Sequence, residues 1–331
     1  MLELAIALPM PVLVLHMTGR GLDLALIGLA FTARALLVVL LELPTGGLAD
    51  AIGRRPIALA SQLFTLASFA LLLFVTGPFT ALAYAVLQGV GSALHSGALD
   101  AWYVDQLHRL DANVPLQPHL AAVDLAQAAG MLVGSAVGGL LPSLTAGLDL
   151  PWPLSGFGIS LFAGVSLRLV VWFATLNLVK EPWRGAVTGD ALMKGVRETP
   201  AILADALRLT RSLPTIRWLL LAAGAGGLAM VSIETFWQPI GATIFGSEAA
   251  DSRPFAVVAT LSGLAVLAGS LAVMRWGERF PGGSAALAGF SLLVRGGALL
   301  VLANAVSGAG VGLGLTVAYF ALATNNVPHD T

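Results

Sequence analysis

The stretch Gly46-Gly-Leu-Ala-Asp50-Ala-Ile-Gly53-Arg54-Arg55 follows the second long apolar segment of the chain. It brings three glycines, a carboxylate and a pair of arginines into one short loop. Gly46 permits close helix packing and Gly53 a tight turn, while the Asp50 carboxylate can accept hydrogen bonds from helix-end amides and from guanidinium groups. The spacing therefore predicts a latch in which Asp50 pairs with Arg54 or Arg55.

The composition around this loop is that of a membrane protein. Hydrophobic residues make up 57% of the chain, charged residues only 11%, and the mean hydropathy is +0.87. Soluble domains carry roughly 25% charged residues. The net charge of −1 excludes a strong basic field of the kind that binds nucleic acid. Cysteine is absent and the five histidines show no ligand spacing, so we expect no metal and no cofactor.

Apolar segments of about 20 residues can cross the hydrocarbon core as helices, and the chain has about ten of them. Their expected cores are residues 2–17, 25–46, 57–77, 80–104, 120–141, 157–179, 215–240, 254–275, 284–303 and 307–325.

The distribution of basic residues predicts the orientation of these spans. With a cytoplasmic N-terminus, twelve of the 17 Lys and Arg residues fall on the cytoplasmic side, two fall outside and three lie within spans. This asymmetry is typical of cytoplasmic loops. Arg dominates over Lys, which favours a GC-rich bacterial genome and hence the bacterial inner membrane. We expect a multi-pass protein whose N-terminus and central loop are cytoplasmic.

The longest polar connection divides the chain into two parts. We expect an N-terminal half of six spans at 1–180, a linker at 181–213 and a C-terminal half of four spans at 214–331. Apolar and basic residues alternate within the linker, which predicts an amphipathic helix on the membrane surface.

The loop from Gly46 to Arg55 resembles the G-x-x-x-D-x-x-G-R-R signature of the major facilitator superfamily (MFS). Anchoring of a span by positive charge would explain Arg54 and Arg55 alone, but not Gly46, Asp50 and Gly53. The resemblance implies an all-α membrane protein, an MFS-type bundle of two pseudo-repeated six-helix halves. About ten of twelve helices would then be present, without the start of the first helix and without helices 11 and 12.

The same resemblance implies functional roles for particular residues. The family's latch includes an acidic residue at the cytoplasmic end of the fourth helix, a place that Asp105 occupies here. A second stretch in the fifth span resembles the g-x-x-x-G-P-x-x-G-G signature of the family's antiporters, through Gly130, Gly134, Ser135, Gly138 and Gly139.

Two positions depart from the antiporter pattern. Ser135 replaces the expected proline, and Ala85 stands where proton-coupled drug exporters carry an arginine. Glycines at every fourth position also have a simpler interpretation, a flat stripe against which a neighbouring helix packs.

Ionisable groups at bilayer depth cost at least ~2.5–3.5 kcal/mol on insertion scales and are therefore candidates for substrate or proton binding. Arg34, Arg168 and Arg295 lie in the middle of their spans, and Glu234 shares one helix face with Trp237 and Gln238, a face suited to an organic cation. An outer-interface location of Glu234 and Trp237 is the alternative.

Three further carboxylates, Glu42, Asp100 and Asp124, are candidates for carrying a coupling proton. Structural pairing between helices is the alternative for Glu42 and Asp100.

The sequence therefore predicts a secondary transporter working by alternating access, and not an enzyme, since no catalytic constellation lies on an aqueous segment. Proton-coupled export of a small hydrophobic or cationic compound is the favoured function. A nutrient or sugar importer and a truncated, non-transporting membrane protein are the alternatives. The expected partners are the small-molecule substrate, protons and the lipid bilayer, and we expect a monomer.

Overall fold

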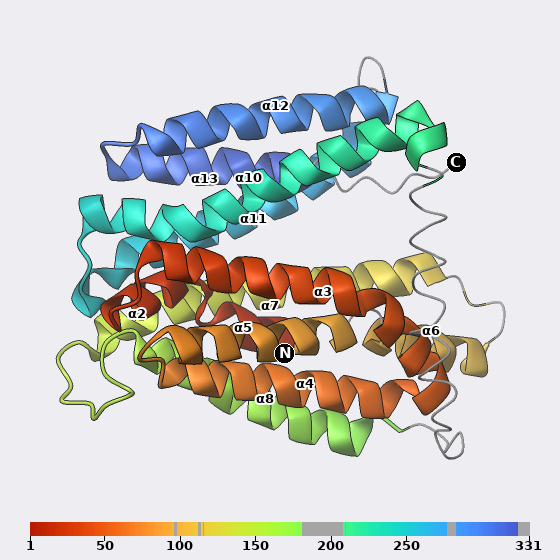
Figure 1. The fold of residues 1–331 in the computed structure, drawn as a ribbon, viewed down its shortest axis with the longest axis horizontal. Coiled ribbons are helices and arrows are strands. Elements are labelled where there is room, and N and C mark those ends of the chain that lie inside the picture. The colour runs from red at the N-terminus through yellow and green to blue at the C-terminus, as the bar shows by residue number, and fades with distance from the viewer. Residues whose placement is uncertain are drawn as a thin grey trace. The chain divides into compact units, whose positions relative to one another are not determined.

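Each of the ten predicted spans corresponds to helical structure in the computed structural model (Figure 1). The structure describes residues 1–95, 98–111, 114, 116–180, 208, 210–276 and 283–323. Every regular element in those ranges is a helix, so the predicted all-α class is confirmed. The elements are α1 (Leu2–Ala7), the 3₁₀ turn η1 (Met10–Val12), α2 (Leu13–Gly19), α3 (Leu24–Ile52), α4 (Arg54–Leu73), α5 (Pro78–His95), α6 (Ala98–Leu110), α7 (Leu116–Thr145), α8 (Gly158–Leu178), α10 (Pro214–Phe245), the 3₁₀ turn η2 (Ala249–Ser252), α11 (Arg253–Trp276), α12 (Gly283–Ala303) and α13 (Gly308–Ala323).

The first predicted span is a broken helix. Pro9 and Pro11 lie in the middle of the expected segment 2–17, and neither can donate a backbone hydrogen bond. The chain accordingly leaves α1 at Ala7, passes through η1 and resumes as α2 at Leu13.

One other expectation, about a segment end, was wrong. The second helix does not end near Gly46, because α3 continues to Ile52 and most of the expected loop is helical. Within the span expected at 80–104, α5 reaches His95 and α6 begins at Ala98, and the two residues between them lie outside the part of the chain that the structure describes.

Many large apolar side chains face outward, as a lipid environment requires. Val39 on α3 is 67% exposed and Leu293 on α12 is 76% exposed. Large apolar side chains exposed in such number are unusual on soluble monomers but suit contact with lipid tails. In the part of the chain that the structure describes, six helical segments are long and apolar enough to span a membrane. They are Leu2–Gly19, Leu24–Glu42, Arg54–Leu73, Pro118–Thr145, Gly158–Leu178 and Ala249–Ala272, and Gly289–Ala303 and Gly308–Leu322 are shorter apolar helices.

The chain divides into two compact units. Unit 1 comprises Met1–Leu2, Met17–Ala126 and Gly164–Arg217, and unit 2 comprises Glu3–His16, Gln127–Ala163 and Trp218–Thr331.

In unit 1, α5 packs closely against both α3 and α4 (Figure 1). Glycine makes this approach possible, since a Cβ at Gly89 would lie 2.8 Å from the Leu37 Cβ on α3. A Cβ at Gly91 would lie 2.6 Å from the Thr65 Cγ2 on α4. Both glycines belong to the Gln88-Gly89-Val90-Gly91 stretch, which therefore serves helix packing.

In unit 2, α11 and α12 both pack along α13. The core of this unit also includes side chains of the broken first helix and of α10. It consists of Val12, Leu15, Phe157, Ile233, Trp237, Phe255, Val258, Ala298, Leu302, Val311, Leu315 and Ala318. The predicted linker at 181–213 lies almost wholly outside the residues that the structure describes, and its amphipathic helix stays a prediction.

Candidate functional site

A single glycine separates α3 from α4. Gly53 adopts φ +107° and ψ 153°, a conformation that residues with a side chain rarely occupy. The helix direction therefore changes within one residue, and Arg54 and Arg55 become the first two residues of α4. The prediction of a tight turn at Gly53 agrees with this geometry.

The two arginines lie where a helix least favours positive charge. The N-terminus of α4 carries a partial positive charge from its free N–H groups, which disfavours a nearby cation by about 0.3–1 kcal/mol. Partners for both guanidinium groups offset this cost.

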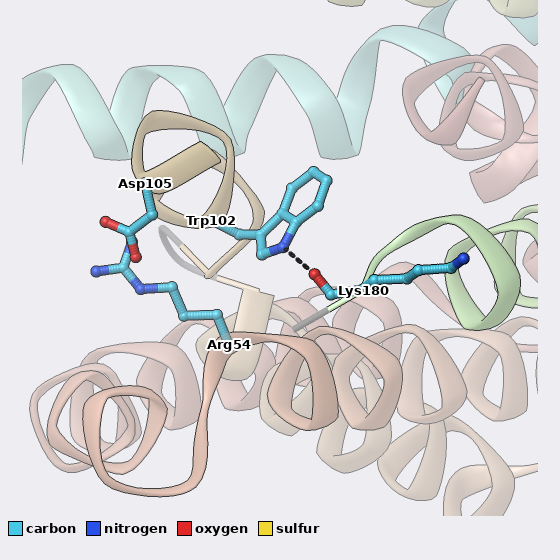
Figure 2. A network of polar contacts seen from close by, with 4 residues as sticks. All are labelled: Arg54, Trp102, Asp105 and Lys180. Carbon is cyan, nitrogen blue, oxygen red and sulfur yellow. Dashed lines mark hydrogen bonds and ion pairs between the residues drawn. The ribbon is translucent and has the colours of Figure 1, made fainter. Parts of the chain in front are cut away.

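Arg54 pairs with Asp105 on α6. Its Nη1 lies 3.3 Å from Oδ2 of Asp105, and the side chains are 18% and 34% exposed. Figure 2 shows the guanidinium group and the carboxylate facing each other. A partly exposed pair of this kind contributes about 0.2–1 kcal/mol to stability. The structure thus brings together two of the residues that were predicted to form the latch.

Arg55 and Trp102 attach the neighbouring elements to the end of α8. Arg55 Nη2 donates to the Leu176 carbonyl oxygen at 2.7 Å, and Trp102 Nε1 donates to the Lys180 carbonyl oxygen at 3.3 Å (Figure 2). The last carbonyls of a helix have no intrahelical partner and attract cations and donors. Arg54, Arg55, Trp102 and Asp105, which we call the arginine cluster, therefore join α4, α6 and the end of α8.

The sequence did not reveal Trp102 or the two carbonyl groups. Arg55 and Leu176 are 121 residues apart, and a backbone acceptor has no sequence signature. Asp50 lies in the last turn of α3, and its side chain is outside what the structure describes. Its part in the latch stays a prediction.

The glycine stripe of α7 packs directly on the backbone of α1 and of Leu8, the residue that follows α1. A Cβ at Gly130 would lie 3.2 Å from the Leu4 N, and one at Gly134 would lie 2.5 Å from the Leu4 O. At Gly138 the Leu8 carbonyl occupies the place of a Cβ. The stripe therefore forms the flat contact surface that its spacing predicted.

Neighbouring groups extend this contact to other helices. The Ser160 hydroxyl of α8 donates to the Gly138 carbonyl at 2.6 Å, and a Cβ at Gly139 would lie 2.6 Å from the Ala256 Cα of α11. Ser135 is half-buried in α7. The proline in the interior of this helix is Pro142, two turns later, and the following Ser143 N–H donates to the Ser252 hydroxyl at 3.0 Å.

Arg168 and Arg34 both belong to unit 1 but differ in burial. Arg168 on α8 is only 4% exposed, and its guanidinium carbon lies 4.4 Å from the centre of the Phe69 ring on α4. This distance is that of a cation–π contact. Arg34 on α3 is half-buried, and its guanidinium carbon lies 5.8 Å from the Phe31 ring on the same helix.

Arg295 on α12 is buried in unit 2, where it is 4% exposed. Its Nη1 lies 3.2 Å from where a Cβ at Gly226 would stand, and its Nη2 lies 3.5 Å from the Leu322 carbonyl on α13. Gly226 thus makes room for the guanidinium group on the face of α10.

The predicted cation-binding face of α10 has two buried members in this conformation. Trp237 is 7% exposed and packs against Phe255, with ring centres 5.8 Å apart. Gln238 is 2% exposed and binds backbone groups of the first helix. Glu234 is half-buried. The sequence reasoning missed the partner of Gln238, which lies 224 residues away.

The proposed proton carriers are distributed differently. Glu42 on α3 and Asp124 on α7 are exposed, and the side chain of Asp100 lies outside the description. Among the residues described, no three His, Asp or Glu side chains are grouped as metal ligands.

A polar face on α4 also escaped the sequence reasoning. Gln62 Nε2 donates to the Thr175 hydroxyl at 3.0 Å, and the Ser68 hydroxyl donates to Gln88 Oε1 at 2.6 Å. All four side chains are buried. The spacing of Ser61, Thr65 and Ser68 was a usable signal, because such residues recur on one helix face.

The family profile described as Major Facilitator Superfamily matches residues 1–331. The chain belongs to this superfamily. It is a multi-pass membrane protein of the MFS transporter fold, and superfamily membership indicates a transporter and not an enzyme.

Solved MFS structures share the fold at low sequence identity. A mutant of the nucleoside transporter NupG matches with a TM-score of 0.69 at 14% identity, covering 98% of this chain and 79% of that one. A bacterial homologue of the human lysosomal transporter Spinster, inward-facing and unoccupied, gives 0.63 at 19% identity, with 98% and 72% covered. A mutant of the peptide transporter POT gives 0.60 at 17% identity, with 98% and 77% covered. No curated protein matches the sequence.

Exchanging the charges of the arginine cluster tests whether the MFS signature acts as a latch. We expect Arg54→Asp to lower the initial transport rate of reconstituted protein by about tenfold, equivalent to ~1.4 kcal/mol, while stability changes by no more than ~1 kcal/mol. The double variant Arg54→Asp with Asp105→Arg should recover most of the rate because it restores an opposite-charge pair. Equal rates for wild type and Arg54→Asp would contradict a role in the transport cycle.

Proposed function

We propose that this MFS protein exports a small hydrophobic or cationic compound by alternating access, in exchange for protons. The feature that favours export is the stretch from Gly130 to Gly139, because it resembles the antiporter signature. Its glycines Gly130, Gly134 and Gly138 pack on the backbone of residues 4–8. Close contact of α7 with the first helix supports a role for the stripe in closing one face of the transporter.

Charges within the membrane supply the binding chemistry of this proposal. Glu234 is half-buried on α10, one turn from the Trp237 ring, and a carboxylate next to an aromatic face attracts organic cations. The buried guanidinium groups of Arg168 and Arg295 are the other substrate candidates.

Proton coupling requires a carboxylate that changes its surroundings during the cycle. Glu42, Asp100 and Asp124 are our candidates, with Arg34 as the cation that one of them approaches. Protonation removes a charge that costs at least ~2.5–3.5 kcal/mol at bilayer depth, so it favours the conformation in which the carboxyl group is shielded from water.

The arginine cluster supplies the conformational latch. Its contacts join α4, α6 and the end of α8 through one ion pair and two hydrogen bonds to carbonyls. Such contacts can exchange with water as helices move, because each contributes little to stability. In the proposed orientation the cluster lies at the cytoplasmic face of the inner membrane.

Transport by membrane vesicles distinguishes export from import. Inverted bacterial vesicles that contain the protein should accumulate the fluorescent cation ethidium when respiration acidifies their lumen. A protonophore added at steady state should release the dye, and the variant Glu234→Gln should accumulate several-fold less.

Two results would contradict the proposal. Accumulation that persists with the protonophore would exclude proton coupling. Uptake by right-side-out vesicles, with none by inverted vesicles, would favour an importer. Asp251→Asn, which changes a carboxylate in the turn η2 outside the long helices, is the matched control and should leave accumulation unchanged.

A further inference from the structure

The first helix has a gap in its hydrogen-bond ladder. In a continuous helix the Val14 N–H would donate to the Met10 carbonyl four residues earlier. Here the Val14 N–H donates to Gln238 Oε1 at 2.8 Å, and Gln238 Nε2 donates to the Met10 carbonyl at 2.8 Å. The Leu15 N–H also points to Gln238 Oε1, at 3.3 Å. The side-chain amide of α10 is therefore inserted between the two halves of a backbone hydrogen bond.

The sequence explains why the gap exists. Pro9 and Pro11 lack N–H groups and prevent a regular helix through this turn, so η1 replaces it. The surroundings are apolar: Val12 and Leu15 belong to the same buried cluster as Trp237. Backbone groups in such a place need hydrogen-bond partners, because each unsatisfied group costs several kcal/mol in the membrane.

The gap is selective for the amide group. It presents a carbonyl acceptor on one side and N–H donors on the other. A carboxylate would place an oxygen against the Met10 carbonyl, and an ammonium group would place its protons against the Val14 N–H. A primary amide satisfies both sides at once.

We propose that the gap between Met10 and Val14 is an exchangeable binding site for a primary amide, with Gln238 as its resident occupant. When α10 withdraws Gln238, the amide edge of a small molecule takes its place and stabilises the broken helix. This goes beyond the proposed export function, because it assigns a ligand chemistry to a backbone site that uses none of the membrane carboxylates.

Chemical rescue of a vacated site tests the proposal without any transport assay. The variant Gln238→Ala of the purified full chain should unfold at a lower temperature than wild type. Excess acetamide should reverse at least half of this decrease in the unfolding midpoint. N,N-dimethylacetamide should not, because it lacks an N–H donor, and acetate should not, because it carries a negative charge.

A second buried glutamine provides the control. Gln88 is 7% exposed and accepts a hydrogen bond from the Ser68 side chain, with no backbone gap behind it. The midpoint of Gln88→Ala should not respond to acetamide. Failure of acetamide to raise the midpoint of Gln238→Ala, or an equal rise in Gln88→Ala, would overturn the proposal.

A shape-conserving variant covers the case in which Gln238→Ala does not fold. Gln238→Met keeps the length of the side chain but loses both polar atoms. It should unfold at a lower midpoint than Gln88→Met, which loses a single hydrogen bond. A midpoint for Gln238→Met equal to that of wild type would show that the gap does not need an amide and would refute the site.

Discussion

Substituting Gly138 by valine should abolish accumulation of folded protein in the membrane. The place of a Cβ at this position is occupied by the Leu8 carbonyl, a backbone atom that cannot rotate away as a side chain would. Overpacking of an ordinary core costs typically 1–3 kcal/mol, and a clash with backbone lies at or above the upper end of that range. The measurements are the yield after detergent extraction, the elution profile and the unfolding midpoint.

Smaller substitutions in the stripe and a substitution at a distant glycine test whether the loss of folded protein comes from this contact. Gly134→Ala should lower the unfolding midpoint less than Gly138→Ala. A Cβ at 134 would lie 2.5 Å from the Leu4 oxygen, whereas the Leu8 carbonyl occupies the Cβ position at 138. Gly28 on α3 has no atom within 4 Å of its Cβ position, so Gly28→Val should leave the yield unchanged. A folded Gly138→Val protein with the wild-type midpoint would show that α7 does not pack on α1 as described.

The spacing of the glycine stripe predicted a flat surface but not the helix that it contacts. Gly130, Gly134 and Gly138 recur every four residues, and this periodicity is visible in any single sequence. The contacts with Leu4 and Leu8 connect residues more than a hundred positions apart. Local periodicity determines which face of a helix is smooth, whereas the partner depends on how distant segments pack.

The same limit applies to the buried charges. Hydropathy placed Arg168 and Arg295 within spans because each is flanked by apolar residues on both sides. It could not show that the first packs on Phe69 and the second beside Gly226. An aromatic ring and a glycine carry no sign of which cation they accommodate.

The broken first helix was foreseeable in part. Pro9 and Pro11 are evident in the sequence, and two prolines within three residues argue against a regular helix. The span expected at residues 2–17 follows from the length of the apolar segment alone, which takes no account of proline. The insertion of Gln238 was beyond sequence reasoning, since its partners are backbone atoms, which are the same at every residue except proline.

Replacing Gly53 by valine should cost both stability and transport. Its backbone, at φ +107° and ψ 153°, lies in a region that is essentially restricted to glycine, and a β-branched residue there costs on the order of 1–3 kcal/mol. Relief of that strain would rotate the start of α4. Because Arg54 and Arg55 follow at once, their contacts with Asp105 and the Leu176 carbonyl would be lost together.

A variant at a second glycine with positive φ serves as a control, because it introduces backbone strain without touching the arginine cluster. Gly21 has φ +85°, no atom lies within 4 Å of its Cβ position, and it joins α2 to α3 away from the arginine cluster. Gly21→Val should lower the unfolding midpoint by a similar amount but leave the transport rate per folded molecule near that of wild type. Gly53→Val should lower that rate at least as much as Arg54→Asp does. If the two glycine variants transport equally well per folded molecule, the turn at Gly53 serves folding alone and the arginine cluster does not depend on it.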